Sequence, residues 1–111
     1  MLDRLYTDNL RPKKSEYGWI ITKDYLDEGD SASSDVGTIG PSNISDEMMK
    51  DLRDGKGKPF RLYDDDRELY YEGRYLGEFE WGDPLSDFGT PNAGCTYMME
   101  KVNGKWEITI G

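Results

Sequence analysis

The stretch YMMEKVNGKWEITI, from Tyr97 to Ile110, carries the clearest local folding signal in the chain. At its centre is Asn103-Gly104, a pair that tolerates the positive φ angles of a type I′ turn. The twist of that turn suits a two-residue hairpin, and the flanking segments contain residue types that favour strands. The sequence therefore predicts a C-terminal Asn-Gly hairpin made of strands 97–102 and 105–110.

The register of this hairpin follows from counting outward from Val102 and Lys105. The pairs expected on the buried face are Met99 with Ile108, Tyr97 with Ile110, and Trp106 with Lys101. On the other face Glu100 opposes Glu107, which is unfavourable for two like charges unless water surrounds them. We therefore expect the Glu100 face to meet solvent.

Strand-like alternation also marks the chain from Pro59 onward. It predicts strands over 60–63 and 68–76, joined by a turn at Asp64-Asp65-Asp66, where short carboxylates accept hydrogen bonds from backbone amides. The second strand has apolar side chains on both faces, so we expect it to be central in the sheet. Gly73 within it is expected to mark a bulge or the close approach of another backbone.

The N-terminal half is predicted to supply one main helix and two short strands. The helix is expected from about Ser45 to Asp54, with Ser45 as its N-cap and Gly55 as its stop signal. Its apolar stripe, which we expect to pack on the core, consists of Ile44, Met48, Met49 and Leu52. The strands are expected at 17–22, a bulky β-branched run, and at 36–39.

The expected fold class is α+β, with a small, mostly antiparallel sheet and the one main helix packed on one face. Residues 1–16 are polar and are predicted to form an N-terminal arm or a short helix, and residues 17–111 to form a single domain. The segment 82–94 has no periodicity and is expected to be a loop whose Leu85 and Phe88 fold back onto the core.

Charge is the dominant feature of the composition. The 111 residues include 23 Asp and Glu against 14 Lys and Arg, which gives a formal net charge of −9. Such a surface repels nucleic acids and anionic membranes, because both bind proteins through neutralisation of their own negative charge. We therefore expect a basic protein surface as the partner, with no direct nucleic-acid or membrane binding. The alternative interpretation is that the charge only keeps the domain soluble.

The sequence contains few of the residue types on which enzymes depend. It has no histidine, which excludes Ser-His-Asp and Cys-His nucleophile systems and histidine metal ligands. Its one cysteine, Cys95, is too few for structural zinc or iron–sulfur ligation, and we expect it to be a small core residue. Gly55-Lys56-Gly57-Lys58 lacks the glycine spacing and the Ser or Thr of a phosphate loop. We therefore expect no enzymatic activity, catalytic residue, cofactor or metal.

The start of the chain has no charged segment followed by an apolar stretch, and no run of about 18 apolar residues occurs. A single cysteine also permits no internal disulfide. These features favour a cytoplasmic location.

The candidate site is an acidic and aromatic segment with five residues of interest: Glu78, Glu80, Trp81, Asp83 and Asp87. In an extended strand Glu78 and Glu80 would point the same way about 6.6 to 6.8 Å apart. That spacing is comparable to two nucleotide steps of about 3.4 Å, so the carboxylates could stand in for phosphates, with Trp81 as an aromatic anchor. The alternative is that the carboxylates are the wet face of a strand whose aromatic residues pack inward.

The C-terminal half resembles a family of small uncharacterised proteins from bacteria, their phages and mobile elements. The resemblance is carried by Tyr63-Asp64-Asp65-Asp66, Leu69-Tyr70-Tyr71 with Gly73-Arg74, Pro84-Leu85 with Asp87-Phe88-Gly89, and Pro91-Asn92-Ala93-Gly94-Cys95-Thr96. It implies a bacterial host cell and a setting in which small acidic proteins often inhibit host defence, as anti-CRISPR or anti-restriction proteins do. It implies no catalytic residue.

The expected function is therefore a non-enzymatic inhibitor that blocks the basic nucleic-acid groove of a bacterial defence complex, as a DNA mimic. Two alternatives from other classes stay open. One is a small carbohydrate-binding or carbohydrate-acting domain, in which Trp81 stacks on a sugar beside paired carboxylates. The other is an accessory protein that forms a homodimer through a sheet edge.

Overall fold

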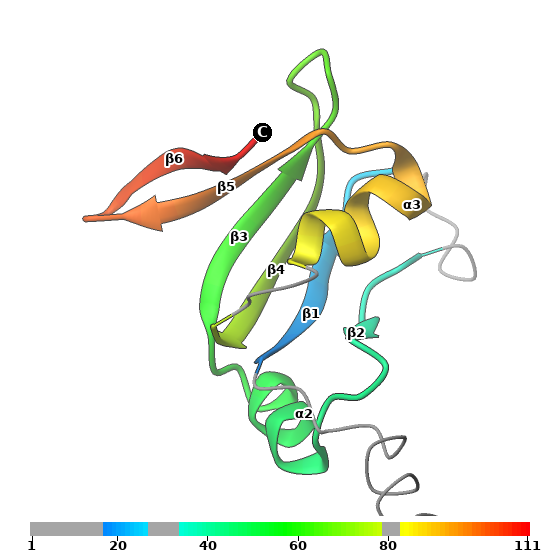
Figure 1. The fold of residues 1–111 in the computed structure, drawn as a ribbon, viewed down its shortest axis with the longest axis vertical. Coiled ribbons are helices and arrows are strands. Elements are labelled where there is room, and N and C mark those ends of the chain that lie inside the picture. Colours follow the sequence, from blue (N-terminus) through cyan, green and yellow to red (C-terminus); the bar gives the residue numbers. More distant parts are fainter. Residues whose placement is uncertain (1–16, 27–33, 79–82) are drawn as a thin grey trace, which may run out of the picture.

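A computed structural model describes residues 17–26, 34–78 and 83–111, and its centre is one six-stranded antiparallel sheet (Figure 1). Along the sheet the strands follow the order β2-β1-β4-β3-β5-β6. The elements in chain order are β1 (Tyr17–Asp24), β2 (Ile39–Gly40), α2 (Asp46–Arg53), β3 (Lys58–Tyr63), β4 (Leu69–Gly77), the π-helical η1 (Leu85–Gly89), α3 (Thr90–Ala93), β5 (Tyr97–Val102) and β6 (Lys105–Ile110). The expectation of a small α+β fold with an antiparallel sheet is confirmed. The predicted arm at 1–16 lies outside the described residues.

Strand β4 is central, as its apolar side chains on both faces predicted, because β1 and β3 flank it. Gly73 allows the neighbouring strands to approach closely. A Cβ built on Gly73 would lie 2.3 Å from the carbonyl oxygen of Ile20 and 2.5 Å from the Phe60 ring. No side chain fits in that space, so glycine is required there.

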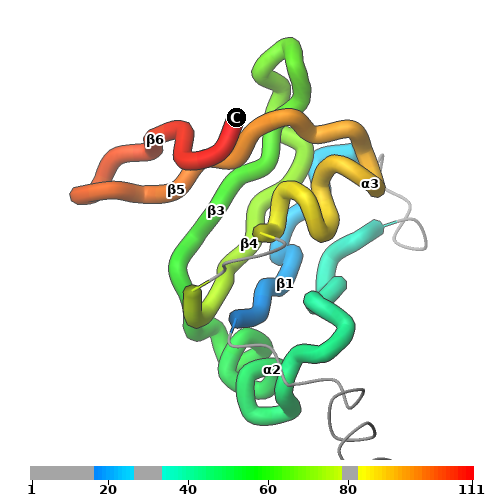
Figure 2. Tube along the Cα trace, in the orientation of Figure 1, coloured from blue at the N-terminus to red at the C-terminus, as the bar shows by residue number. Residues whose placement is uncertain are grey.

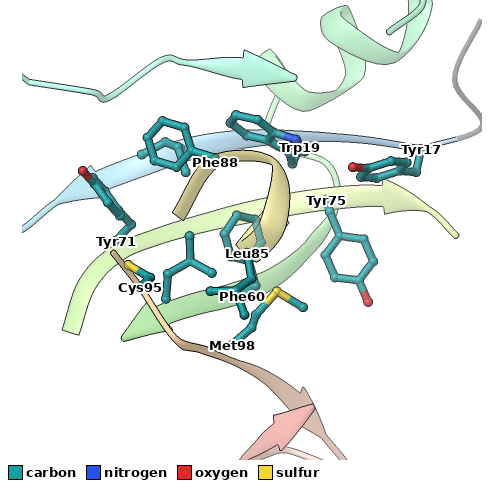
Figure 3. Packing of buried hydrophobic residues seen from close by; sticks show 11 residues of the cluster. Tyr17, Trp19, Phe60, Tyr71, Tyr75, Leu85, Phe88, Cys95 and Met98 are labelled. Atoms are coloured by element: carbon teal, nitrogen blue, oxygen red, sulfur yellow. The ribbon is translucent and has the colours of Figure 1, made fainter. Parts of the chain in front are cut away.

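One face of the sheet carries the larger core, shown in Figure 3. Side chains from β1, β3, β4 and β5 meet η1 here, and the buried residues are Tyr17, Trp19, Ile21, Phe60, Leu62, Tyr71, Tyr75, Leu85, Phe88, Cys95 and Met98. The Phe88 ring packs against Tyr71, with centroids 4.9 Å apart. The expectations that Leu85 and Phe88 fold onto the core and that Cys95 is a core residue are confirmed.

Helix α2 packs on the opposite face, at the β1 and β4 end of the sheet. Ser45 is its N-cap, and the Ser45 side chain accepts a hydrogen bond from the Met48 amide. The predicted stripe is confirmed, because Ile44, Met48, Met49 and Leu52 belong to one apolar cluster with Ile20 of β1.

The segment 82–94, expected to be a loop, is helical from Leu85 to Ala93 in two short pieces. Pro84 begins it with φ −56°, an angle that a first helical turn accepts, and Gly94 ends it with φ 69°. Helical structure therefore covers both faces of the sheet rather than one. The segment is too short for a helical period to show in the sequence.

The predicted strand at 36–39 is wrong in its extent. Val36 and Gly37 form a turn, Gly37 has φ 94°, and only Ile39–Gly40 pairs with β1. A positive φ interrupts the extended backbone that a strand needs.

Strands β5 and β6 are adjacent and antiparallel, and they extend away from the rest of the sheet (Figure 2). Asn103 and Gly104 between them have φ 53° and 81°. The register contains an irregularity that the sequence did not predict, because Met98 rather than Tyr97 lies opposite Ile110.

The burial predicted for these strands is wrong at Ile108 and on the Glu100 face, whereas Ile110 packs against the larger core as expected. Met98 is fully buried, whereas Ile108, expected on the buried face, is 52% exposed. Strand β3 lies on the other side of β5 and pairs Phe60 with Glu100, which puts the Glu100 side chain on the face of the larger core. The register of β5 and β6 alone could not reveal which face of β5 the core covers, because that depends on the pairing of β5 with β3.

Candidate functional site

The residues expected to form the candidate site fall into two groups. Glu78, Asp83 and Asp87 are described, whereas Glu80 and Trp81 lie outside the described residues. Strand β4 ends at Gly77, so Glu78 follows the strand rather than belonging to it. The extended arrangement of Glu78 and Glu80 stays a prediction.

Asp87 is held against the core by a direct contact. Its Oδ2 accepts a hydrogen bond of 2.7 Å from the indole Nε1 of Trp19 in β1. Trp19 is 3% exposed, while Asp87 reaches the surface. The bond therefore fixes the position of a surface carboxylate through a buried ring.

Asp83 is fixed one helical turn earlier. Its Oδ1 accepts a hydrogen bond of 2.9 Å from the Ser86 backbone amide, and its backbone oxygen accepts one from the Asp87 amide. Side chains in this position satisfy amides at the start of a helix. Asp83 just before η1 and Asp87 within it thus both have defined positions.

Tyr17 connects these two carboxylates to the end of the sheet. Burial raises the pKa of its hydroxyl, and the negative charges of Asp87 and Asp83 raise it further. Tyr17 also lies opposite Gly77 at the end of β4, the residue before Glu78. Glu78, Asp83 and Asp87 are therefore all associated with the end of the sheet where β1 begins.

Glu100 is a fourth carboxylate of this region, and sequence reasoning missed it. Its Oε1 accepts a hydrogen bond from the Tyr75 hydroxyl, whose pKa is raised by burial and then by this bond. A shallow pocket of about 380 Å³ is lined by Glu100 and Glu78 with Lys58, Tyr75 and Gly77. We call Glu78, Asp83, Asp87 and Glu100 the acidic end. Correct placement of Met98 in the core would have identified Glu100, two residues along the same strand.

The face of the sheet opposite the larger core has a groove of about 370 Å³ with cationic walls. The negative net charge of the chain gave no indication of it. Its lining includes Lys23, Arg61, Arg74 and the Trp106 ring, with Glu72 between the cations. The Arg61 guanidinium carbon lies 4.0 Å from the centroid of the Trp106 ring. We call this the cationic groove.

Internal contacts already engage the charges of the cationic groove. Arg61 Nε donates to Glu72 Oε1 at 2.8 Å, and Lys23 Nζ lies 3.7 Å from Glu72 Oε2. Arg74 donates to the backbone oxygens of Leu52 and Lys56 at the end of α2. These contacts tie the cations of the groove to the sheet and to the end of α2.

The described residues also bear on thiol reactivity, metal binding and membrane insertion. Burial raises the pKa of the Cys95 thiol to about 11, and the charge of Asp64 adds to the effect. Within the described ranges, no three His, Cys, Asp or Glu side chains are grouped so that they could hold a metal ion. No helix in the described part of the chain has the length and apolar character needed to cross a membrane.

Comparison with protein-family models, curated proteins and solved structures finds no match to this chain. The resemblance noted for the C-terminal half stays a prediction.

Proposed function

We propose that the protein is a non-enzymatic binding protein whose acidic end docks on the basic nucleic-acid groove of a bacterial defence complex. In that role it acts as a DNA mimic and competes with the nucleic acid for the groove. The family resemblance supplies the setting, an inhibitor carried by a phage or mobile element in the cytoplasm of its bacterial host.

The single observation that carries the proposal is the convergence of carboxylates from three separate parts of the chain. Glu78 follows β4, Asp83 and Asp87 come with η1, and Glu100 belongs to β5. Hydrogen bonds within the protein hold Asp83, Asp87 and Glu100 in place. A preorganised anionic surface binds cations with a smaller entropic cost than mobile side chains do.

Net charge supports the same function over longer distances. A formal charge of −9 steers the chain toward a cationic groove before contact is made. Once the surfaces meet, the fixed carboxylates of the acidic end give the interaction its position. Binding by this mechanism weakens as salt rises, since screening lengths fall to about 8 Å near physiological ionic strength.

The test is competition with labelled duplex DNA for a purified RNA-guided nuclease that carries its guide. We expect the wild-type chain to displace the DNA, with an affinity that falls steeply between low and high salt. The triple variant Glu78→Gln, Asp83→Asn and Glu100→Gln should compete at least roughly tenfold less well. The amides keep an acceptor oxygen for Tyr75 and the Ser86 amide, so the fold should survive.

A matched control removes the same amount of charge elsewhere. Glu47, Asp65 and Glu68 are exposed, and the triple variant Glu47→Gln, Asp65→Asn and Glu68→Gln leaves the acidic end intact. The control should compete nearly as well as wild type. Equal loss in both triple variants, or competition that ignores salt, would contradict docking through the acidic end.

The carbohydrate alternative depends on Trp81, which lies outside the described residues. A change of tryptophan fluorescence on titration with oligosaccharides would support it.

A further inference from the structure

Strand β6 is the last strand of the sheet and, among the described residues, pairs on one side only, with β5. It is six residues long, whereas β2 at the other edge has two. A long edge strand presents unpaired backbone amides and carbonyls and is a template for pairing with another strand.

The alternation of antiparallel ladders identifies which groups face outward. Val102 and Lys105 flank the turn and lie opposite each other, and a hydrogen-bonded pair there directs the backbone of Lys105 and Glu107 toward β5. The backbone of Trp106 and Ile108 then faces the free edge. Ile108 is also 52% exposed.

We propose that β6 pairs antiparallel with β6 of a second copy of this chain, about a two-fold axis at Trp106. In this register Trp106 lies opposite Trp106 of the second copy. Lys105 lies opposite Glu107 of the second copy, and the two-fold axis makes that pair twice. Opposite charges facing each other across strands are stabilising.

Charge selects this register over its neighbours. Moving the axis by one residue to Glu107 would set two glutamates against each other, which is destabilising. Moving the axis further, to Ile108, would extend the pairing past Ile108. Regular pairing is lost there, because Met99 lies opposite Ile108 while the next residue of β5, Met98, lies opposite Ile110. The segment Lys105–Glu107 lies within β6 and is self-complementary in charge, and this is why a second copy is the occupant that fits.

Overall charge works against association, because each copy carries −9. Salt screens this long-range repulsion more than it weakens the adjacent Lys105–Glu107 pairs. The dimer should therefore tighten as salt rises, which is the opposite of the behaviour expected for docking on a basic groove. The two interactions use different surfaces, so either can fail without the other.

The test is sedimentation equilibrium of the full chain over a range of concentrations, with a charge-swap series on β6. Wild type should be a reversible dimer. Glu107→Lys and Lys105→Glu each set like charges opposite one another twice and should raise the dimer dissociation constant roughly tenfold or more. The double swap Lys105→Glu with Glu107→Lys restores complementarity and should return the constant to near its wild-type value.

Helix α2 supplies the controls. Glu47 and Lys50 are exposed there, and Glu47→Lys and Lys50→Glu change the net charge by the same amounts as the single variants on β6. They should change the dissociation constant only slightly, and circular dichroism should show all variants folded. A wild-type chain that stays monomeric at the highest concentration, or a double swap that remains as weak as the single variants, would overturn the proposal.

Discussion

The indole Nε1 of Trp19 donates a hydrogen bond of 2.7 Å to Oδ2 of Asp87, across 68 positions of the chain. The Trp19 ring also packs against Phe88, with centroids 5.2 Å apart. Together these contacts attach the helical segment Leu85–Ala93 to β1. One residue of the acidic end is therefore also part of what holds the fold together.

Loss of this bond should destabilise the protein. Asp87→Ala leaves a buried indole N–H without its acceptor, and we expect the free energy of unfolding to fall by about 1–3 kcal/mol. Asp87→Asn keeps an acceptor oxygen and should cost less. Urea denaturation followed by circular dichroism measures both variants, and equal stability of Asp87→Ala and wild type would contradict the structural role.

Gly73 should tolerate no side chain. Gly73→Ala would push a methyl group to 2.3 Å from the Ile20 carbonyl oxygen, so the strands must shift. We expect a loss of roughly 1–3 kcal/mol, typical of overpacking. Thermal unfolding measures the loss, and Ser42→Ala at an exposed position serves as a control that should leave the melting temperature unchanged.

Three core tyrosines should make the protein sensitive to alkali. Burial raises the hydroxyl pKa of Tyr17, Tyr71 and Tyr75 above the ordinary value of 10.0, and neighbouring Asp87, Asp35 and Glu100 respectively add to it. The folded state therefore keeps protons that the unfolded state releases. The contribution of these protonated tyrosines to the free energy of unfolding is fully present below about pH 10, the pKa of tyrosine in the unfolded chain. It is lost as the pH rises from there toward the higher pKa values of the folded state.

Urea titrations at several pH values from 8 to 11 would follow this loss of stability. Ultraviolet absorbance of tyrosinate should show that ionisation of these tyrosines accompanies unfolding. Stability that remains constant above pH 10 would contradict the expectation.

The Cys95 thiol should be unreactive in the folded protein. It is fully buried, and its pKa of about 11 leaves little thiolate near neutral pH. A disulfide reagent at pH 8 should react slowly with the native chain and at least about a hundredfold faster in denaturant. Similar rates in both conditions would show that the site opens readily.

Local patterns were enough for much of the fold. The Ser45 cap, the apolar stripe of α2 and the central place of β4 all follow from neighbouring residues, because capping and period depend on positions within a few residues of each other. The same holds for the turn at Asp64, whose Oδ1 accepts from the Asp66 and Glu68 amides.

Long-range packing decided what local patterns could not. An irregular register between β5 and β6, together with pairing to β3, turns Met98 into the core and brings Glu100 to the acidic end. The period of a strand is two, so the two faces look alike in the sequence until another element covers one of them.

By itself, the sequence determined a small acidic α+β fold with a central β4, a capped helix and a buried cysteine. Only the tertiary structure decided that Leu85–Ala93 is helical, that Asp87 accepts a hydrogen bond from Trp19, and that cations gather in a groove on the sheet face opposite the larger core. These features depend on contacts between residues that are far apart in the chain. Such contacts form only when the strands pair, so a local hydrophobic period does not predict them.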